Sequence, residues 1–496
     1  MKRYIVVLSA LLATVAFAPR SSAQQSSKLT VAIAMPTTPA VTDTADVLPT
    51  IVVPEITVPE PATIDTVKKI AGARKASSFL TTAPGIEMQN YRPEDKRGIN
   101  VFEAPKDESV AYDGFKLQWG AAFTQQFQGL DHRNTAAPRL ITAGTPPVTT
   151  NANQLIRIGH GPNNATANLY LNGQLARGIR VAMTTYNSSR HHNETWVKDG
   201  YLLVDASPID WAPLNSIMKY VTIRAGHFEI NYGDAHFRRT DNGNSMRNPL
   251  VGNYIMDAFT TEVGGELYLR ANGFMAMAGI TGGEVRGMIA SPEKRSPTYL
   301  AKVGYDKKFS DDLRFRLTAS NYAKASSVNN TLFSGDRAGS RYYDVLENTT
   351  STEAAQAWSG AIQPGMRNSI HSFVVNPFLQ FRGLELFGNI ERAKGRAATE
   401  TANRTWKQNV GEVVYRFLPD QRLYVAARYN TVKGPLTVGT PEVSVKRTQV
   451  GGGWFLTPNL LTKIEYVNQK YLDFPTTDVR NGGKFKGFMV EGVVAF

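Results

Sequence analysis

The chain has 496 residues, no cysteine, and 55 lysines and arginines against 42 aspartates and glutamates, for a formal net charge of +13. Hydrophobic residues make up 42% of it, and no run after the N-terminus reaches about 18 consecutive apolar residues, which excludes a helical membrane protein. Disulfides cannot hold this fold together. A large hydrogen-bonded β-sheet is a sufficient substitute.

The first 23 residues have the layout of a secretory signal peptide. Two basic residues precede an apolar run over positions 4–17, and small residues permit cleavage after Ala23. A buried first helix of a cytoplasmic protein is the alternative, but the three features together predict export. Cleavage removes Lys2, Arg3 and Arg20 and takes the charge from +13 to +10, which suits anionic partners such as lipopolysaccharide.

Residues 24–113 are predicted to be a Pro-rich periplasmic leader or linker. Six prolines fall between positions 36 and 61, a composition typical of extended or disordered chain. Residues 86–113 are polar and lack a clear period. The sequence leaves open whether they stay in the periplasm or enter a pore.

A period of two begins at Phe115 and continues to the last residue. Phe315 and Leu317, for example, stand on either side of Arg316. The pattern predicts an all-β protein, a transmembrane antiparallel β-barrel over residues 114–496 with about 16 strands, or 18 as the alternative. The predicted strands lie near residues 115–128, 165–177, 179–190, 196–206, 219–232, 259–270, 273–284, 298–309, 313–325, 371–382, 384–394, 406–418, 422–433, 445–457, 460–472 and 485–496.

Connection lengths support the barrel independently, because periplasmic turns should be short and outer loops long. Loops such as 129–164, 233–258 and 326–370 alternate with short joints. The joint at 207–218 is longer than the other joints. A soluble β-sandwich, the alternative, would show no such asymmetry. The short joints are Gly178, Ala271-Asn272, Ser310-Asp311-Asp312, Gly383, Pro419-Asp420-Gln421 and Pro458-Asn459.

The last strand ends in Phe496 on an apolar face with Phe488, Val490 and Val494. A terminal aromatic on such a strand resembles the signature that outer-membrane assembly machinery reads in porins. Aromatic residues also concentrate near strand ends, as interfacial girdles require. They are Trp119, Trp196, Tyr201, Tyr220, Tyr232, Tyr305, Tyr415, Phe417, Trp454, Tyr466 and Tyr471.

Three segments resemble the paired central strands of a known family. They are YLLVD (201–205), VTIRAGHFE (221–229) and YG (232–233), and they resemble outer-membrane porins of the 16-stranded, phosphate-selective O/P type. The resemblance covers a short part of the barrel and extends to the rest only as architecture. It implies that the next loop, Asp234 to Met256, bends inward and narrows the pore, and that basic side chains select anions.

The loop after residue 233 carries a dense set of charges. Guanidinium groups that face carboxylates across a narrow gap would orient the electric field that a solute crosses. Arginine suits this role because its planar fork binds carboxylate or phosphate oxygens in pairs. A solvated outer loop that contacts lipopolysaccharide is the alternative. The candidates for the pore constriction are Asp234, His236, Arg238, Arg239, Asp241 and Arg247.

The alternation also predicts which charged side chains face the lumen. The main basic candidates are Arg180, Arg224, Lys302, Arg314, Arg316 and Arg428. Further inward cations are Lys116, Arg382, Arg416, Arg447 and Lys463, and the inward acids are Asp306, Glu385, Glu391, Glu412 and Glu465. This modestly positive balance predicts a mild anion preference.

His191-His192-Asn193-Glu194 is the one cluster with metal-ligand residue types. Adjacent histidines on an extended segment point to opposite sides, so they chelate a metal poorly. We therefore expect no metal site, and a polar hairpin tip is the default.

Together these features predict an exported outer-membrane porin, not an enzyme, for passive diffusion of small hydrophilic or anionic solutes. Expected partners are the lipid bilayer and lipopolysaccharide, with a possible homotrimer, no nucleic acid and no cofactor. The alternatives are a barrel with an adhesive or structural role and a barrel-embedded hydrolase, although no histidine lies in a recognisable nucleophile motif. A TonB-dependent transporter is disfavoured because residues 24–113 are too irregular for a folded plug.

Overall fold

The computed structural model describes residues 88–104, 106, 112–191, 194–207, 209–284, 289–335, 338–352 and 357–496. The predicted signal peptide and residues 24–87 of the leader lie outside this range. Within it, no helix is long and apolar enough to cross a membrane.

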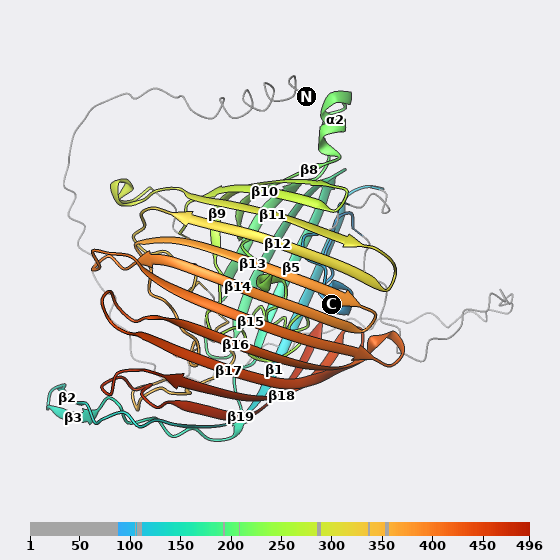
Figure 1. Cartoon of the computed structure of the whole chain (residues 1–496). Coiled ribbons are helices and arrows are strands. Elements are labelled where there is room, and N and C mark those ends of the chain that lie inside the picture. The colour runs from blue at the N-terminus through green and yellow to red at the C-terminus, as the bar shows by residue number, and fades with distance from the viewer. Residues whose placement is uncertain are drawn as a thin grey trace, which may run out of the picture. The chain divides into compact units, whose positions relative to one another are not determined.

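Sixteen long antiparallel strands of the described chain form a closed barrel, which confirms the prediction and rules out 18 strands. Neighbours in sequence pair around the wall (Figure 1), and β19 pairs with β1 to close it, with Ala122 opposite Ala495. The wall strands are β1 (Lys116–Arg133), β5 (Thr166–Ala176), β6 (Ile179–Ser188), β7 (Trp196–Val204), β8 (Val221–Glu229), β9 (Thr261–Ala271), β10 (Phe274–Thr281), β11 (Thr298–Lys308), β12 (Leu313–Lys324), β13 (Ser369–Phe381), β14 (Leu384–Arg396), β15 (Arg404–Phe417), β16 (Leu423–Pro435), β17 (Glu442–Thr457), β18 (Leu460–Leu472) and β19 (Lys484–Ala495).

Side chains alternate between the two faces of this wall. On β11, Tyr299 and Val303 are exposed while Leu300 and Lys302 are buried. The outer face is therefore apolar and suited to lipid, and the inner face carries the charges. Other outward apolar residues include Leu386, Ile390, Val425, Ile464, Phe488, Val490 and Phe496.

Some of the predicted girdle residues do point outward near strand ends, among them Trp119, Tyr220, Tyr415 and Trp454. The Trp119 ring lies 5.9 Å from that of the C-terminal Phe496. Tyr232 and Tyr471 are instead buried inside, so the girdle prediction was wrong for them. Tyr232 follows the end of β8 into the lumen, and Tyr471 packs on Phe474.

The two ends of the barrel differ in their connections. At the end with short joints, Gly178 has φ +66°, and a side chain there would collide with Ala206. Arg382 lies in another short joint, with φ +53°, exposed and paired with Asp312, so the prediction that it faces the lumen was wrong. A turn residue in the left-handed region no longer follows the strand alternation.

Several small elements lie outside the wall strands, and the period of two did not predict them. The long connection after β1 holds the hairpin β2 (Leu140–Ala143) and β3 (Val148–Asn151) and the two-residue strand β4 (Gly161–Pro162), which pairs with β1. The helix α2 (Ala212–Met218) lies in the long joint between β7 and β8. Single turns of 3-10 helix are η1 (Lys96–Gly98), η2 (Ala235–Phe237), η3 (Pro292–Lys294) and η4 (Pro419–Gln421).

Candidate functional site

The connection between β8 and β9, residues 230–260, folds into the lumen, and we call it the inward loop. The backbone N–H of Val251 donates to Glu465 on β18 (2.8 Å), and that of Ile255 donates to Asn430 on β16 (2.7 Å). The loop thus crosses the barrel from the β8–β9 side to the opposite wall. This path agrees with what the family resemblance implied for Asp234 to Met256.

The connection between β12 and β13, residues 325–368, also enters the barrel, and we call it the second inward loop. The Tyr342 hydroxyl donates to Glu465 on β18 (2.6 Å), and the Tyr343 backbone N–H donates to Gln128 on β1 (3.0 Å). Apolar side chains of the two inward loops pack in one buried cluster. The described parts of both loops therefore fill much of the lumen.

Residues 88–104, part of the predicted leader, form a third inward segment, the lumen strap. Backbone and side-chain groups attach it to strands all around the barrel. Its contacts are Gln89 with Gln174 on β5 (3.5 Å), Lys96 with Pro458 between β17 and β18 (3.1 Å), Asn100 with Glu385 on β14 (2.7 Å) and Glu103 with Lys302 on β11 (3.1 Å). The sequence left two locations open for this segment, and these contacts place it inside the barrel.

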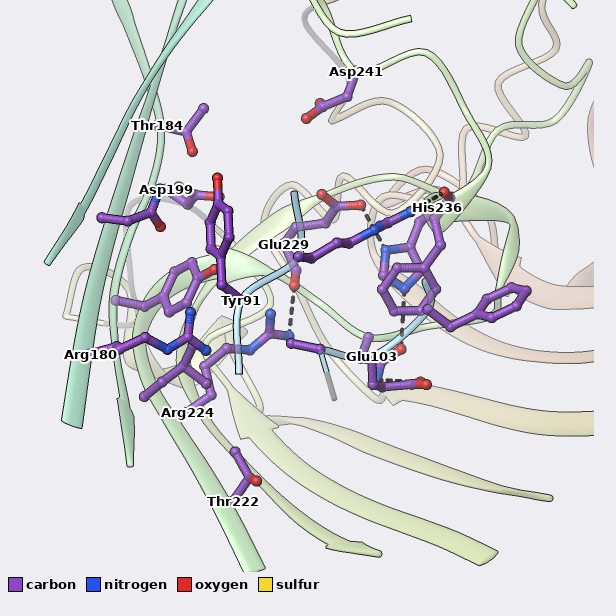
Figure 2. Close-up of a pocket in the computed structure, with 18 of the residues that line it drawn as sticks. Tyr91, Glu103, Arg180, Thr184, Asp199, Thr222, Arg224, Glu229, His236 and Asp241 are labelled. Carbon is purple, nitrogen blue, oxygen red and sulfur yellow. Dashed lines mark hydrogen bonds and ion pairs between the residues drawn. The ribbon is translucent and has the colours of Figure 1, made fainter. Parts of the chain in front are cut away.

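A cavity of about 200 Å³ remains between the strap, the inward loop and the wall from β5 to β9. Figure 2 shows Arg180 and Arg224 across this cavity from Asp241 and His236. Tyrosine, threonine and asparagine side chains, together with Phe102, Ala104, Leu203 and Phe237, complete the lining. The lining cations are Arg92, Arg180, Lys198, Arg224, Arg239, Arg247 and Arg270, and the lining acids are Glu94, Glu103, Asp199, Asp205, Glu229 and Asp241.

Four of the six predicted constriction residues line this cavity: His236, Arg239, Asp241 and Arg247. Each of the four contacts an opposite charge or an acid from the wall, the strap or the loop itself. The pairs are His236 with Glu229 (2.8 Å), Arg239 with Asp257 (2.7 Å), Asp241 with Lys198 (2.8 Å) and Arg247 with Glu94 (2.6 Å). The structure thus brings these four residues together at one gap.

Asp234, a fifth candidate, lies away from the cavity and anchors the inward loop to β11 and β12. Its carboxylate pairs with Arg316 (2.8 Å) and Lys302 (2.7 Å), which also pair with Glu103 of the strap (2.8 and 3.1 Å). Burial would raise the pKa of Glu103, but Arg316 and Lys302 hold it well below its ordinary value. Lys302 and Arg316 thus sit between two carboxylates, and neither is among the described residues that line the cavity.

Arg238, the sixth candidate, anchors the same loop to β14 and β15. Its guanidinium pairs with Glu412 (2.8 Å) and Glu385 (3.2 Å). Arg428 on β16 pairs with Glu412 (2.6 Å) and donates to the carbonyl of Gly252 in the loop (2.7 Å). These buried charges hold the loop in place and are not in contact with the cavity.

Of the six main lumen cations, Arg180 and Arg224 line the cavity. Arg180 is buried, its nearest paired carboxylate is Asp205 at 3.8 Å, and its Nε has no hydrogen-bond partner among the described residues. Arg224 pairs with Glu266, 3.1 Å from its Nε. Arg314, like the anchoring cations, is neutralised elsewhere, by Asp306 at 2.6 Å.

Sequence reasoning missed Lys198 and Asp199, which both line the cavity. The pairing of β6 with β7 shifts by one residue here, because Thr184 lies opposite Asp199 and Thr185 opposite Val197. Such a bulge turns two consecutive side chains inward and breaks the alternation. A strict period of two assigns only one of them to the lumen.

The strap residues Tyr91, Arg92, Glu94 and Glu103 were also missed as lining residues. The only signal was the density of charge over residues 92–97, which include Arg92 and Glu94 but neither Tyr91 nor Glu103. Contacts between segments that are far apart in sequence leave no periodic trace, so this signal could not locate them.

His236 is the titratable group of the cavity lining closest to neutrality in its ordinary pKa. Burial lowers the pKa of His236 below 6.5, although Glu229 opposes this effect. The imidazole is therefore neutral at pH 7, and its two ring nitrogens contact Glu229 (2.8 Å) and Asn231 (3.1 Å).

The histidine cluster at 191–194 is described only in part, because residues 192 and 193 lie outside the described range. His191 lies 3.6 Å from Glu194 and packs on Trp196. Among the residues with described positions, no group of three or more histidine, aspartate or glutamate side chains is placed to hold a metal ion.

Comparisons with known proteins found no matching family model and no matching curated relative. Solved structures do match. An anion-selective porin from Comamonas acidovorans is 10% identical with a TM-score of 0.46, over 77% of this chain and 100% of that one. OprB from Pseudomonas putida is 10% identical with a TM-score of 0.44, over 77% and 94%, and the channel DcaP of Acinetobacter baumannii is 8% identical with a TM-score of 0.43, over 78% and 99%. At these values the similarity decides nothing about function, which has to be inferred from the residues of this chain.

Proposed function

We propose that this protein is a porin-type channel of the outer membrane through which small hydrophilic solutes diffuse passively. The observation that carries the proposal is a closed barrel, apolar outside, with a charge-lined cavity along one side of its lumen. A closed barrel satisfies its backbone hydrogen bonds in lipid, and polar lumen walls replace the hydration of a passing solute.

The proposed path runs along the wall from β5 to β9, because buried ion pairs join the inward loop to the opposite wall along β11 to β16. The cavity has a volume of about 200 Å³. Such a gap admits only small solutes. The four constriction candidates that line it would set the field there.

A mild anion preference follows from the charges of the lining, which include seven cations and six carboxylates. Two of the cations form no ion pair with any described residue. Arg92 donates to the carbonyls of Gly98 (3.1 Å) and Phe237 (2.9 Å), and Arg270 donates to the Thr222 hydroxyl (3.0 Å). These guanidinium groups can therefore bind a solute anion.

The outer-membrane location rests on the apolar outer face together with the predicted signal peptide. Contact with lipopolysaccharide, cleavage after Ala23 and assembly as a homotrimer stay predictions. The proposed class of solute, small and hydrophilic with a preference for anions, rests on the cavity alone.

Planar-bilayer recordings of the purified full chain test this function, with Arg270→Gln and Arg382→Gln as a matched pair. Both variants remove one arginine charge near the short joints, but Arg270 lines the cavity and Arg382 is exposed outside it. We expect a small conductance with an anion-favouring reversal potential, a shift toward cations in Arg270→Gln and no shift in Arg382→Gln. A protein that does not conduct would favour the adhesive or structural role. Equal selectivity of both variants and the parent would refute the proposed path.

A further inference from the structure

The joint between β7 and β8 differs from the other joints at its end of the barrel. It spans residues 205–220, whereas the joints after β9, β13 and β17 span only 272–273, 382–383 and 458–459. Helix α2 lies within it, and Pro213 in the first turn favours the start of a helix there. A tight turn would suffice to join the two strands, so the extra residues need another explanation.

The extra residues expose an unusual amount of apolar surface. The exposed fractions are 63% for Ile209, 60% for Trp211, 52% for Ile217 and 52% for Tyr220. Within the helix, Met218 is buried and Leu214 is half-buried, so one apolar side rests on the protein and the next points away from it. The opposite side carries Asn215 and Ser216.

Helix α2 takes no part in the lumen. Figure 1 shows it standing out from the wall at the end of β8, and none of its residues lines the cavity. Tyr220, at its base, borders an apolar hollow of about 750 Å³ on the outer face, together with Phe274, Tyr305 and Leu317. The exposed apolar surface of the joint is therefore continuous with the lipid-facing surface of β9 to β12.

We propose that α2 and the residues flanking it lie in the headgroup layer of the leaflet at the short-joint end, with Ile209, Trp211 and Ile217 inserted into the lipid. This inference rests on the proposed membrane location. Tryptophan and tyrosine favour this layer because their rings are apolar and their N–H or O–H groups stay hydrated. Asp210 and Lys219 flank the segment and can reach water from its edge. The partner is thus a phospholipid surface, and α2 with its flanking residues acts as an interfacial membrane anchor of the barrel.

The absence of cysteine allows single reporters to be placed without background labelling. We would replace Ile217, Ile390 or Thr142 by cysteine in the full chain and attach an environment-sensitive fluorophore. Ile390 points outward in the middle of β14, and Thr142 is exposed in the β2/β3 hairpin. Vesicles of phosphatidylethanolamine and phosphatidylglycerol would carry a quencher either near the headgroup or deep in the acyl chains, and iodide would report water.

The expected result is strong quenching of the Ile217→Cys label by the shallow lipid quencher, of the Ile390→Cys label by the deep one and of the Thr142→Cys label by iodide. If the Ile390→Cys label resists lipid quenchers, the proposed membrane location is wrong, and the proposed interfacial anchor is wrong with it. If that label behaves as expected while the Ile217→Cys label is quenched by iodide, the interfacial anchor alone is refuted. Protection of the Ile217→Cys label from the lipid quenchers and from iodide would point to a protein partner, such as a second copy, and would also overturn the inference.

Discussion

Two opposite parts of the barrel wall, β11 to β16 and β5 to β9, carry the same kinds of charge on their inner face but in different surroundings. Along β11 to β16, Lys302, Arg316 and Arg428 are buried among carboxylates that belong to the inward loop, the strap and the wall. Along β5 to β9, Arg180 and Arg270 border a cavity; Arg180 is 3.8 Å from Asp205, and Arg270 donates to the Thr222 hydroxyl. A buried charge with its partner attached fixes a loop, whereas one that borders open volume can act on a solute.

This comparison teaches that an inward-facing charge is not by itself a pore charge. Four of the six main lumen cations pair with carboxylates away from the cavity and have no contact with it. Their role is to hold the segments that narrow it. The following predictions separate the holding charges from the lining charges, from the largest expected effect to the smallest.

Removal of the lumen strap should have the largest effect on conductance. Deletion of residues 88–104 empties the space between the inward loop and the short-joint end, so we expect a several-fold increase in single-channel conductance. Because a deletion can disturb assembly, the double variant Glu94→Gln with Glu103→Gln serves as a milder test. It breaks the links to Arg247, Lys302 and Arg316 and should give frequent transitions to a larger conductance. A channel of unchanged size in both variants would contradict the placement of the strap.

Loss of an anchor should reduce stability before it changes selectivity. Asp234→Asn leaves Arg316 and Lys302 with one carboxylate fewer, and breaking such a buried cluster costs about 3–5 kcal/mol. Urea unfolding in detergent, followed by tryptophan fluorescence, measures this loss. Asp312→Asn, which removes the partner of exposed Arg382, is the matched control and should cost about 0–1 kcal/mol. Equal losses would mean that the buried cluster does not hold the loop.

Removal of a lining charge should change selectivity. Lys198 lies near Glu229 (2.7 Å), Asp241 (2.8 Å) and Asp199 (3.9 Å). Lys198→Met leaves these carboxylates without their shared cation, so the reversal potential should shift toward cation preference. Lys433→Met, on an exposed pair with Glu442, should leave the reversal potential unchanged.

The smallest expected effect is a pH dependence from His236. Because burial lowers the pKa of His236, the ring is neutral at pH 7 and gains a proton only below its ordinary titration range. Protonation adds one positive charge to the cavity, so anion preference should rise as the pH falls below the ordinary histidine range. The variant His236→Gln should lose that rise, and an identical pH profile in the variant would remove His236 from the lining.

The strands of the wall could be predicted from the sequence because the residue pattern within each strand shows which side chains face outward. Outward apolar and inward polar residues repeat every two positions, and loop lengths alternate between the two ends. The observed strands follow the predicted ones closely, and β18 coincides with residues 460–472. Local geometry also explains the failures, since a left-handed turn residue displaced Arg382 and a bulge brought both Lys198 and Asp199 inward.

The cavity could be predicted only in part. The charge density after residue 233 drew attention to His236, Arg239, Asp241 and Arg247, which line the cavity, but it could not separate them from the anchors Asp234 and Arg238. That separation depends on which distant strand each side chain reaches, such as β12 for Asp234 and β14 for Arg238. No local pattern in the sequence encodes such a pairing.

The central claim is that solutes pass along the wall from β5 to β9 and not along the opposite wall. Cysteine block of the open channel tests it directly, with Thr184→Cys on the cavity lining and Ser320→Cys facing inward on β12. We predict that a charged methanethiosulfonate reagent reduces the single-channel current of Thr184→Cys and leaves that of Ser320→Cys unchanged. Block at Ser320→Cys without block at Thr184→Cys would contradict the claim.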